Sequence, residues 1–156
     1  MTVHVREANE HDTADIVALW EDFMELLRFT NPHYWKVRDG RAAFSTYLVN
    51  TFREDNILVA VAEIKGEGLV GFSLAQIEIL PDWFGSEQIG LIRYQCVSEN
   101  YRGKGVGHEM TTFVIEWFRS LGIRRIELNV LNGLPASGYW SKIGFKEFMD
   151  RRFIEI

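Results

Sequence analysis

Two cations and three glycines lie within the segment at residues 102–107, directly before a run of regularly spaced apolar residues. The cations are Arg102 and Lys104. Glycine lets backbone N–H groups approach an anion without a Cβ in the way, and the first N–H groups of a helix have no partner inside the helix. Together with the positive end of the helix dipole, this composition favours a phosphate-binding loop. A glycine-rich turn with solvated basic side chains is the competing interpretation.

Two familiar phosphate-binding loops can be tested against these residues. A P-loop needs Gly-Lys followed by Ser or Thr, and the chain has no such triplet. The dinucleotide fingerprint G-x-G-x-x-G is half met by Gly105 and Gly107, and Glu127 stands where its acidic residue is expected, but the third glycine position holds Met110. Neither an ATP site nor a nicotinamide site is therefore favoured.

Composition limits the remaining function classes. At 156 residues and 47% hydrophobic, the chain is expected to form one domain, residues 1–156, with a substantial core. The net charge of -5 argues against nucleic acid as a partner and favours cationic ligands. Without a long apolar run or a basic leader, we expect a cytoplasmic protein that does not bind membranes.

The single cysteine, Cys96, cannot form an internal disulfide or build a zinc site alone, so no metal is expected. The four histidines lack a motif that would pair one of them with Cys96 as a nucleophile. A buried, chemically inert thiol is the favoured interpretation.

Hydrophobic periodicity places the glycine segment between a strand and a long helix. Helical spacing starts at Asp12, a candidate N-cap, and ends near Pro32; a second helix is expected over 40–52. Three β-rich runs follow, then a helix from about Met110, a strand, a short helix that begins with Pro135, and a closing hairpin. The expected runs after the second helix cover residues 56–64, 69–80, 89–97, 124–131, 144–148 and 151–156.

Arg102, Gly105 and Gly107 spell R-x-x-G-x-G, and the segment from about 89 to 146 resembles the core of the GNAT superfamily of N-acetyltransferases. The closing letters of that core are also present, as an aromatic pair followed by K-x-G-F at residues 142–145. The resemblance implies an α/β (α+β) fold with a mixed, largely antiparallel sheet of six to seven strands flanked by about four helices.

The resemblance also implies acetyl-CoA as the donor. Its pantetheine arm is expected along the strand that ends at Val97, where a backbone N–H of Cys96 or Val97 would stabilise the oxyanion. The residues expected to bind the cofactor are Gln95, Cys96, Val97, Arg102, Gly103, Lys104, Gly105, Val106, Gly107, His108, Asn132 and Trp140.

At the catalytic positions the sequence departs from the family pattern. The column that often holds a tyrosine general acid holds Trp140, so Tyr139 is the candidate acid, with an acid-free route as the alternative. The strand before the loop carries no carboxylate, which leaves Glu127 as the candidate base, with Glu78 and Asp82 as alternatives and a water relay expected.

The predicted function is direct acetyl transfer to a primary amine of a small molecule or peptide. A non-catalytic acyl-CoA-binding module of the same fold is the alternative, and a homodimer is left open. The acceptor pocket is expected from residues 28–35, the helix that carries Tyr47, and residues 80–88. Four aromatic residues there could hold a cation or an apolar group: Tyr34, Trp35, Trp83 and Phe84.

Overall fold

The computed structural model describes residues 1–34 and 40–156, so Trp35, one of the expected acceptor-side aromatics, lies outside the described residues. Five strands and four α-helices make up its regular structure, joined by three short 3-10 helices. In chain order the elements are β1 (Val3–Glu7), α1 (Thr13–Thr30), α2 (Gly40–Thr51), β2 (Ile57–Ile64), β3 (Gly68–Ile79), β4 (Gln88–Val97), α3 (Val106–Ser120), β5 (Ile126–Leu128) and α4 (Ala136–Lys142).

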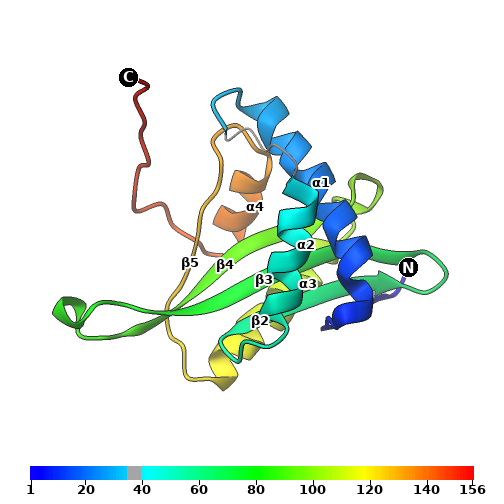
Figure 1. The fold of residues 1–156 in the computed structure, drawn as a ribbon, viewed down its shortest axis with the longest axis horizontal. Coiled ribbons are helices and arrows are strands. Elements are labelled where there is room, and N and C mark those ends of the chain that lie inside the picture. The colour runs from blue at the N-terminus through cyan, green and yellow to red at the C-terminus, as the bar shows by residue number, and fades with distance from the viewer. Residues whose placement is uncertain (35–39) are drawn as a thin grey trace.

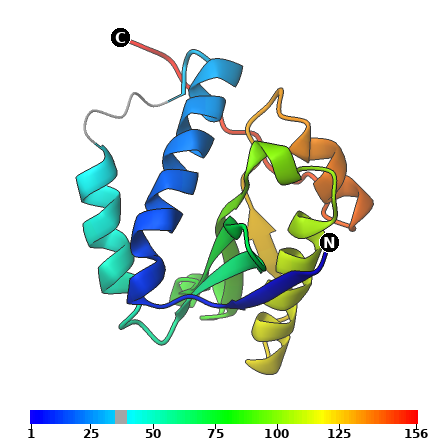
Figure 2. The same cartoon turned by 90° about the vertical axis from the view of Figure 1, so that its right-hand side faces the viewer.

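The five strands form one sheet in the order β1-β2-β3-β4-β5. The first four strands are antiparallel neighbours, whereas β5 runs parallel to β4. Helices α1 and α2 cover one face of this sheet and α3 and α4 cover the other, as the two views show (Figures 1 and 2). The α+β class and the four helices agree with the sequence-based expectation.

Helix α1 follows from the spacing of its apolar residues. Ile16, Trp20 and Leu27 lie on one face and are buried against the sheet. The ring of Trp20 stacks on Phe44 of α2 with their centroids 4.3 Å apart. The helix stops at Thr30, two residues before Pro32, as predicted.

Asp12 occupies the N-cap position of α1, as predicted, but its side chain does not cap the helix. Its side chain makes no capping hydrogen bond to α1. Its carboxylate accepts two hydrogen bonds from the Arg6 guanidinium, at 2.8 and 2.9 Å, and a third from the backbone N–H of Asn9. The bidentate ion pair satisfies this carboxylate, which is almost fully buried, better than a single capping bond could.

A β-bulge interrupts the pairing of β3 with β4. Leu74 pairs with Tyr94 and Ala75 with Ile92, so Arg93 is the extra residue. Arg93 bonds to Gln76 of β3, while the Tyr94 ring packs edge-on against Phe44 of α2. The bulge therefore turns two consecutive side chains toward the face that α1 and α2 cover.

Helix α3 lies close against the opposite face. Met110, Val114 and Phe118 are fully buried along one side of it. A Cβ on Gly90 would lie 2.7 Å from the Phe118 ring, so this position in β4 has no room for a larger residue. The helix that the apolar spacing predicted is thus confirmed, and it fixes the loop that precedes it.

The predicted closing hairpin does not form, and the sheet has five strands rather than six or seven. Residues 145–156 adopt no regular structure and leave the body beyond α4 (Figure 1). Alternation in this segment is typical of a strand, but a strand needs an edge to pair with. The last element paired into the sheet, β5, is only three residues long.

None of the described helices is long and apolar enough to span a lipid bilayer.

Candidate active site

Only part of the β4 edge that faces β5 is paired with that strand. The two strands pair over Gly90–Ile92 and Ile126–Leu128, and β4 then continues alone on this side to Val97. Because Ser98 N–H donates to Val70 on the β3 side, the alternation of an antiparallel ladder directs the backbone groups of Gln95 and Val97 toward the free edge. The same alternation directs those of Cys96 toward β3. The free edge therefore offers N–H and C=O groups to an extended ligand.

The glycine segment lies at the end of this edge and leads into α3. Gly103 and Gly105 have φ of 72° and 88°, a conformation that side-chain-bearing residues rarely adopt. Helix α3 starts at Val106, and its first hydrogen bond runs from Glu109 N–H to Gly105 C=O. The N–H groups of the preceding first turn point out of the helix end, which makes an anion site.

Arg102 connects the glycine segment to the free edge. Its Nε donates to the Val97 carbonyl at 3.0 Å. The rest of the guanidinium stays exposed and keeps its charge available beside the α3 N-terminus. Lys104 instead lies over the Tyr101 ring, with its Nζ 5.5 Å from the ring centroid.

A polar network joins β4, α3 and α4 beneath the loop. Gln95 Nε2 donates to Thr111 Oγ1 at 2.8 Å and to the Gly107 carbonyl at 3.2 Å. The Tyr139 hydroxyl lies 2.7 Å from Thr111 Oγ1 and 3.1 Å from the Gly107 carbonyl oxygen. The structure thus brings three of the predicted residues, from separate elements, to one point at the first turn of α3.

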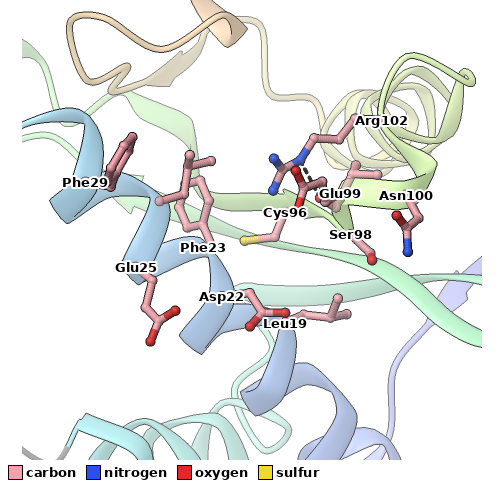
Figure 3. Close-up of a pocket in the computed structure, with 12 residues that line it drawn as sticks. Leu19, Asp22, Phe23, Glu25, Phe29, Cys96, Ser98, Glu99, Asn100 and Arg102 are labelled. Atoms are coloured by element: carbon pink, nitrogen blue, oxygen red, sulfur yellow. Dashed lines mark hydrogen bonds between the residues drawn. The ribbon is translucent and has the colours of Figure 1, made fainter.

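A cavity of about 660 Å³ opens between α1 and the segment from Cys96 to Arg102. Figure 3 shows the Phe23 ring and the Cys96 sulfur facing each other across it, with the Arg102 guanidinium nearby. Its lining also carries three carboxylates, from Asp22, Glu25 and Glu99.

The Cys96 thiol is buried, as predicted. Its side chain is buried in the core that α1 and α2 form with the sheet. Burial raises the pKa of this thiol well above its usual value, so the thiol stays protonated at neutral pH. What Cys96 contributes to the site is its place in the wall of the cavity.

The remaining predicted residues do not belong to this polar network. Glu127 of β5 pairs with Arg125 at 2.7 Å and lies on the sheet face opposite its neighbours Ile126 and Leu128. Trp140 is buried in the core beneath α4. The three other predicted ligands are the buried Val106 and the exposed His108 and Asn132.

Three tyrosines gather on the α1/α2 side near the free edge. Tyr94 of β4 and Tyr47 of α2 both pack against Phe44, with ring centroids 5.7 and 6.1 Å away. Tyr34, just after α1, packs on the same core. Partial burial raises the pKa of Tyr34 and of Tyr47, so both hydroxyls remain neutral hydrogen-bonding groups.

Trp83 and Phe84, two aromatic residues expected near the acceptor, do not lie beside the cavity at Cys96. Trp83 and Phe84 sit in the connection between β3 and β4, where they are 81% and 65% exposed. This hairpin projects away from the α1 C-terminus (Figure 1), and neither residue lines the cavity beside Cys96. Asp82 of the same turn accepts a hydrogen bond from Ser86. Glu78, the other alternative base, forms an ion pair with Arg93 at 2.6 Å.

The sequence analysis missed Thr111, which joins all the members of the polar network. It is a buried polar residue at the fourth position after Gly107, on the inward side of α3. A threonine on an otherwise apolar helix face was the signal that could have identified it.

Among the described residues, no group of histidine, cysteine and acidic side chains is arranged to hold a metal ion.

Comparisons with known proteins identify the family and the fold. The sequence model of the Acetyltransferase (GNAT) family matches residues 20–145. The chain belongs to this family. No curated protein matches the sequence.

Several solved structures share the fold at low sequence identity. The tetramutant of BH1408 from Bacillus halodurans has a TM-score of 0.87 at 17% identity, covering 98% of this chain and 99% of its own. A predicted acetyltransferase from Clostridium acetobutylicum, solved with acetyl-CoA, has a TM-score of 0.79 at 15% identity and coverage of 99% and 96%. An aminoglycoside acetyltransferase from an uncultured soil metagenomic sample, in complex with sisomicin, has a TM-score of 0.70 at 15% identity, with coverage of 99% and 96%.

Proposed function

We propose that this protein transfers an acetyl group from acetyl-CoA directly to a primary amine of a small molecule or peptide. The observation that carries the proposal is the free edge of β4 leading into the glycine segment and the N-terminus of α3. A single ligand with an amide-containing arm and a pyrophosphate matches both parts. Family membership and the similar fold solved with acetyl-CoA support this donor.

The residues present fit this donor. The arm would pair with the backbone groups of Gln95 and Val97 as an added strand, and the pyrophosphate would accept hydrogen bonds from the first turn of α3. Arg102 supplies a fixed charge there. A Cβ on Gly107 would lie 3.7 Å from the Gln95 side chain and 3.8 Å from that of Val97, so the bare glycine keeps open the corner between loop and edge.

Bound acetyl-CoA supplies an activated thioester, whose C–S bond breaks as a C–N bond to the amine forms. The N–H of Val97 points to the free edge and can stabilise negative charge on the thioester oxygen. The N–H of Cys96 faces β3 instead. Of the two N–H groups predicted to stabilise the oxyanion, we therefore propose that of Val97. A backbone donor fixed in a strand needs no reorganisation during the reaction.

Two proton transfers complete the reaction, one from the ammonium and one to the departing thiolate. We assign the second to Tyr139, whose hydroxyl lies at the first turn of α3 on the α3/α4 side. Glu127 lies on the other face of the sheet and is the candidate that receives the ammonium proton through water. The two groups thus lie on opposite faces of the sheet, with Glu127 opposite Leu91 in the paired part of β5.

The acceptor is expected on the α1/α2 side, where the cavity and the three tyrosines lie. The carboxylates of Asp22, Glu25 and Glu99 outnumber the single guanidinium of Arg102 in the cavity lining. Together with the net charge of -5, they favour an acceptor that arrives as a cation. Aminoglycosides, polyamines and basic peptides fit this description.

One observation favours the alternative, a module that binds acyl-CoA without catalysis. Between Leu91 and Val97 the strand β4 carries no carboxylate, and Trp140 occupies the place where relatives often have an acid. Such a module would bind acetyl-CoA without consuming it when amines are added.

Thiol release from acetyl-CoA separates the two functions. We expect release that depends on the added amine in a panel of aminoglycosides, polyamines, amino acids and peptides, with the acetylated amine detected by mass spectrometry. Binding of acetyl-CoA with no amine-dependent release across the whole panel would support the binding module instead.

A further inference from the structure

The inner part of the cavity beside α1 is apolar on both of its sides. Leu19, Phe23 and Leu26 stand at i, i+4 and i+7 on α1, and all three are half-buried in the cavity lining. This spacing places their side chains next to one another on one face of the helix. Cys96 and Val97 belong to the opposite wall, where the Cys96 sulfur faces the Phe23 ring (Figure 3). A ligand in this part of the cavity would therefore meet mainly apolar side chains.

A second row of residues on α1 forms an acidic rim. Asp22, Glu25 and Phe29 follow one another along the helix at i, i+3 and i+7 (Figure 3), and all three are exposed members of the cavity lining. Neither carboxylate forms an ion pair within the part of the chain that the structure describes. Their neighbour Glu21, by contrast, pairs with Arg41 at 2.6 Å. The two rim carboxylates are thus open to a cationic ligand.

An apolar wall with an acidic rim fits some amines better than others. Methylene groups gain free energy when they leave water for an apolar wall, whereas hydroxyl and peptide groups lose it unless the wall offers them hydrogen bonds. The hydroxylated rings of an aminoglycoside and the backbone of a basic peptide would both carry this cost. A chain of methylene groups between charged nitrogens would not, because its carbons match the inner row and its charges match the rim.

We propose that the acceptor is a linear aliphatic polyamine, with one nitrogen reacting beside Val97 and a second, charged nitrogen bound by Asp22 and Glu25. This inference rests on the proposed function, because it names the acceptor of the same site. The nitrogen that attacks the thioester must be neutral, so recognition of charge falls on the second one, an alkylammonium with a pKa of about 10. The α1 side of the lining extends from Leu19 to Phe29, about 15 Å along the helix axis, which suits an elongated ligand.

Two acceptors of equal length test the second nitrogen. Cadaverine and hexylamine have the same number of heavy atoms in a chain, but only cadaverine carries a second cation. We expect kcat/KM for thiol release from acetyl-CoA to be about tenfold higher with cadaverine, the scale of a hydrogen bond to a charged group. In Asp22→Asn/Glu25→Gln the ratio should fall to about one, chiefly through a higher KM for cadaverine. Asp15→Asn, an exposed acid of α1 outside the cavity lining, should keep the wild-type ratio.

The same assay distinguishes this inference from the proposed function. Equal kcat/KM for cadaverine and hexylamine, a ratio that survives the double change, or a higher kcat/KM for an aminoglycoside or a lysine-containing peptide than for cadaverine and spermidine would each overturn the polyamine assignment and leave acetyl transfer in place. If no amine releases thiol although acetyl-CoA raises the Tm, the proposed function fails together with its acceptor. A rise in Tm with acetyl-CoA in the double variant shows that this variant is folded.

Discussion

We assign the protonation of the departing thiolate to Tyr139, whose hydroxyl is also hydrogen-bonded within the protein. If it is the acid, Tyr139→Phe should lower turnover by about 100-fold or more while acetyl-CoA still binds, since that is the usual scale for losing a general acid. Steady-state thiol release and calorimetric titration of acetyl-CoA measure the two quantities separately. A loss of less than threefold would make Tyr139 a packing residue.

Thr111→Val is the matched control for that change. It removes the 2.7 Å contact with Tyr139 but keeps the phenol. We expect a much smaller effect on turnover than that of Tyr139→Phe.

A substitution at Gly107 should weaken ligand binding without weakening the fold. Alanine here meets only ordinary contacts at 3.7 and 3.8 Å, and in the first turn of α3 it should leave stability unchanged or raise it by up to about 1 kcal/mol. Its methyl group would fill the corner beside Val97, so we expect the acetyl-CoA affinity to fall about tenfold or more.

The control for Gly107→Ala is Gly138→Ala in α4, where a Cβ has no neighbour within 4 Å. It should gain similar stability and keep full affinity. Calorimetry that finds both variants binding acetyl-CoA equally well would contradict the placement of the donor at this corner.

At this scale the sequence predicted backbone conformation better than contacts between side chains. Gly103 and Gly105 could be recognised because few residues other than glycine adopt a positive φ. Thr111 and Arg93 could not, because a network of side chains and the register of a β-bulge both depend on the packing of separate elements. The side-chain partner of Asp12 could not be predicted for the same reason, since Arg6 belongs to another element.

At the scale of elements, the site depends on how closely β3, β4 and α3 approach. A Cβ on Gly71 would lie 2.8 Å from the Cys96 carbonyl oxygen and 3.0 Å from the Met110 side chain. Backbone cannot yield as a flexible side chain can, so Gly71→Ala should lower the free energy of unfolding by about 1–3 kcal/mol. Chemical denaturation measures this; a variant as stable as wild type would contradict the close approach.

The helices α1 and α3 were predictable because each buries one face against the sheet, which imposes the helical period on the sequence. Residues 151–156 carry a strand-like pattern as well, yet they form no strand. A helix satisfies its own backbone, whereas a strand needs the edge of another strand. Alternation alone therefore predicts the tendency to pair, but not the partner.

At the scale of the whole molecule, the Arg6–Asp12 ion pair links stability to pH. Hydrogen bonding from Arg6 lowers the pKa of the Asp12 carboxyl. The folded state therefore binds this proton more weakly than the unfolded state, whose pKa is about 3.9. The contribution of the pair is complete above that pH and is lost as the pH falls through the folded value.

Asp12→Asn should accordingly be less stable than wild type by about 1–3 kcal/mol at pH 7, with a difference that shrinks at pH 3. Urea denaturation at the two pH values measures it. Glu63→Gln is the control: Glu63 also pairs with Arg6, at 3.2 Å, but its side chain is 42% exposed, so its loss should cost less than about 1 kcal/mol. A gap between Asp12→Asn and wild type that does not change with pH would exclude this role for the pair.

The central claim is that the free β4 edge and the α3 N-terminus together bind acetyl-CoA, and thermal unfolding with added acetyl-CoA tests it most directly. A ligand present at 100 times its Kd adds about 2.7 kcal/mol to the free energy of unfolding. For a chain of this size, that should raise the Tm by about 5–10 °C. A rise of this size in wild type, reduced in Gly107→Ala, is the predicted result, and an unchanged Tm at millimolar acetyl-CoA would contradict the claim.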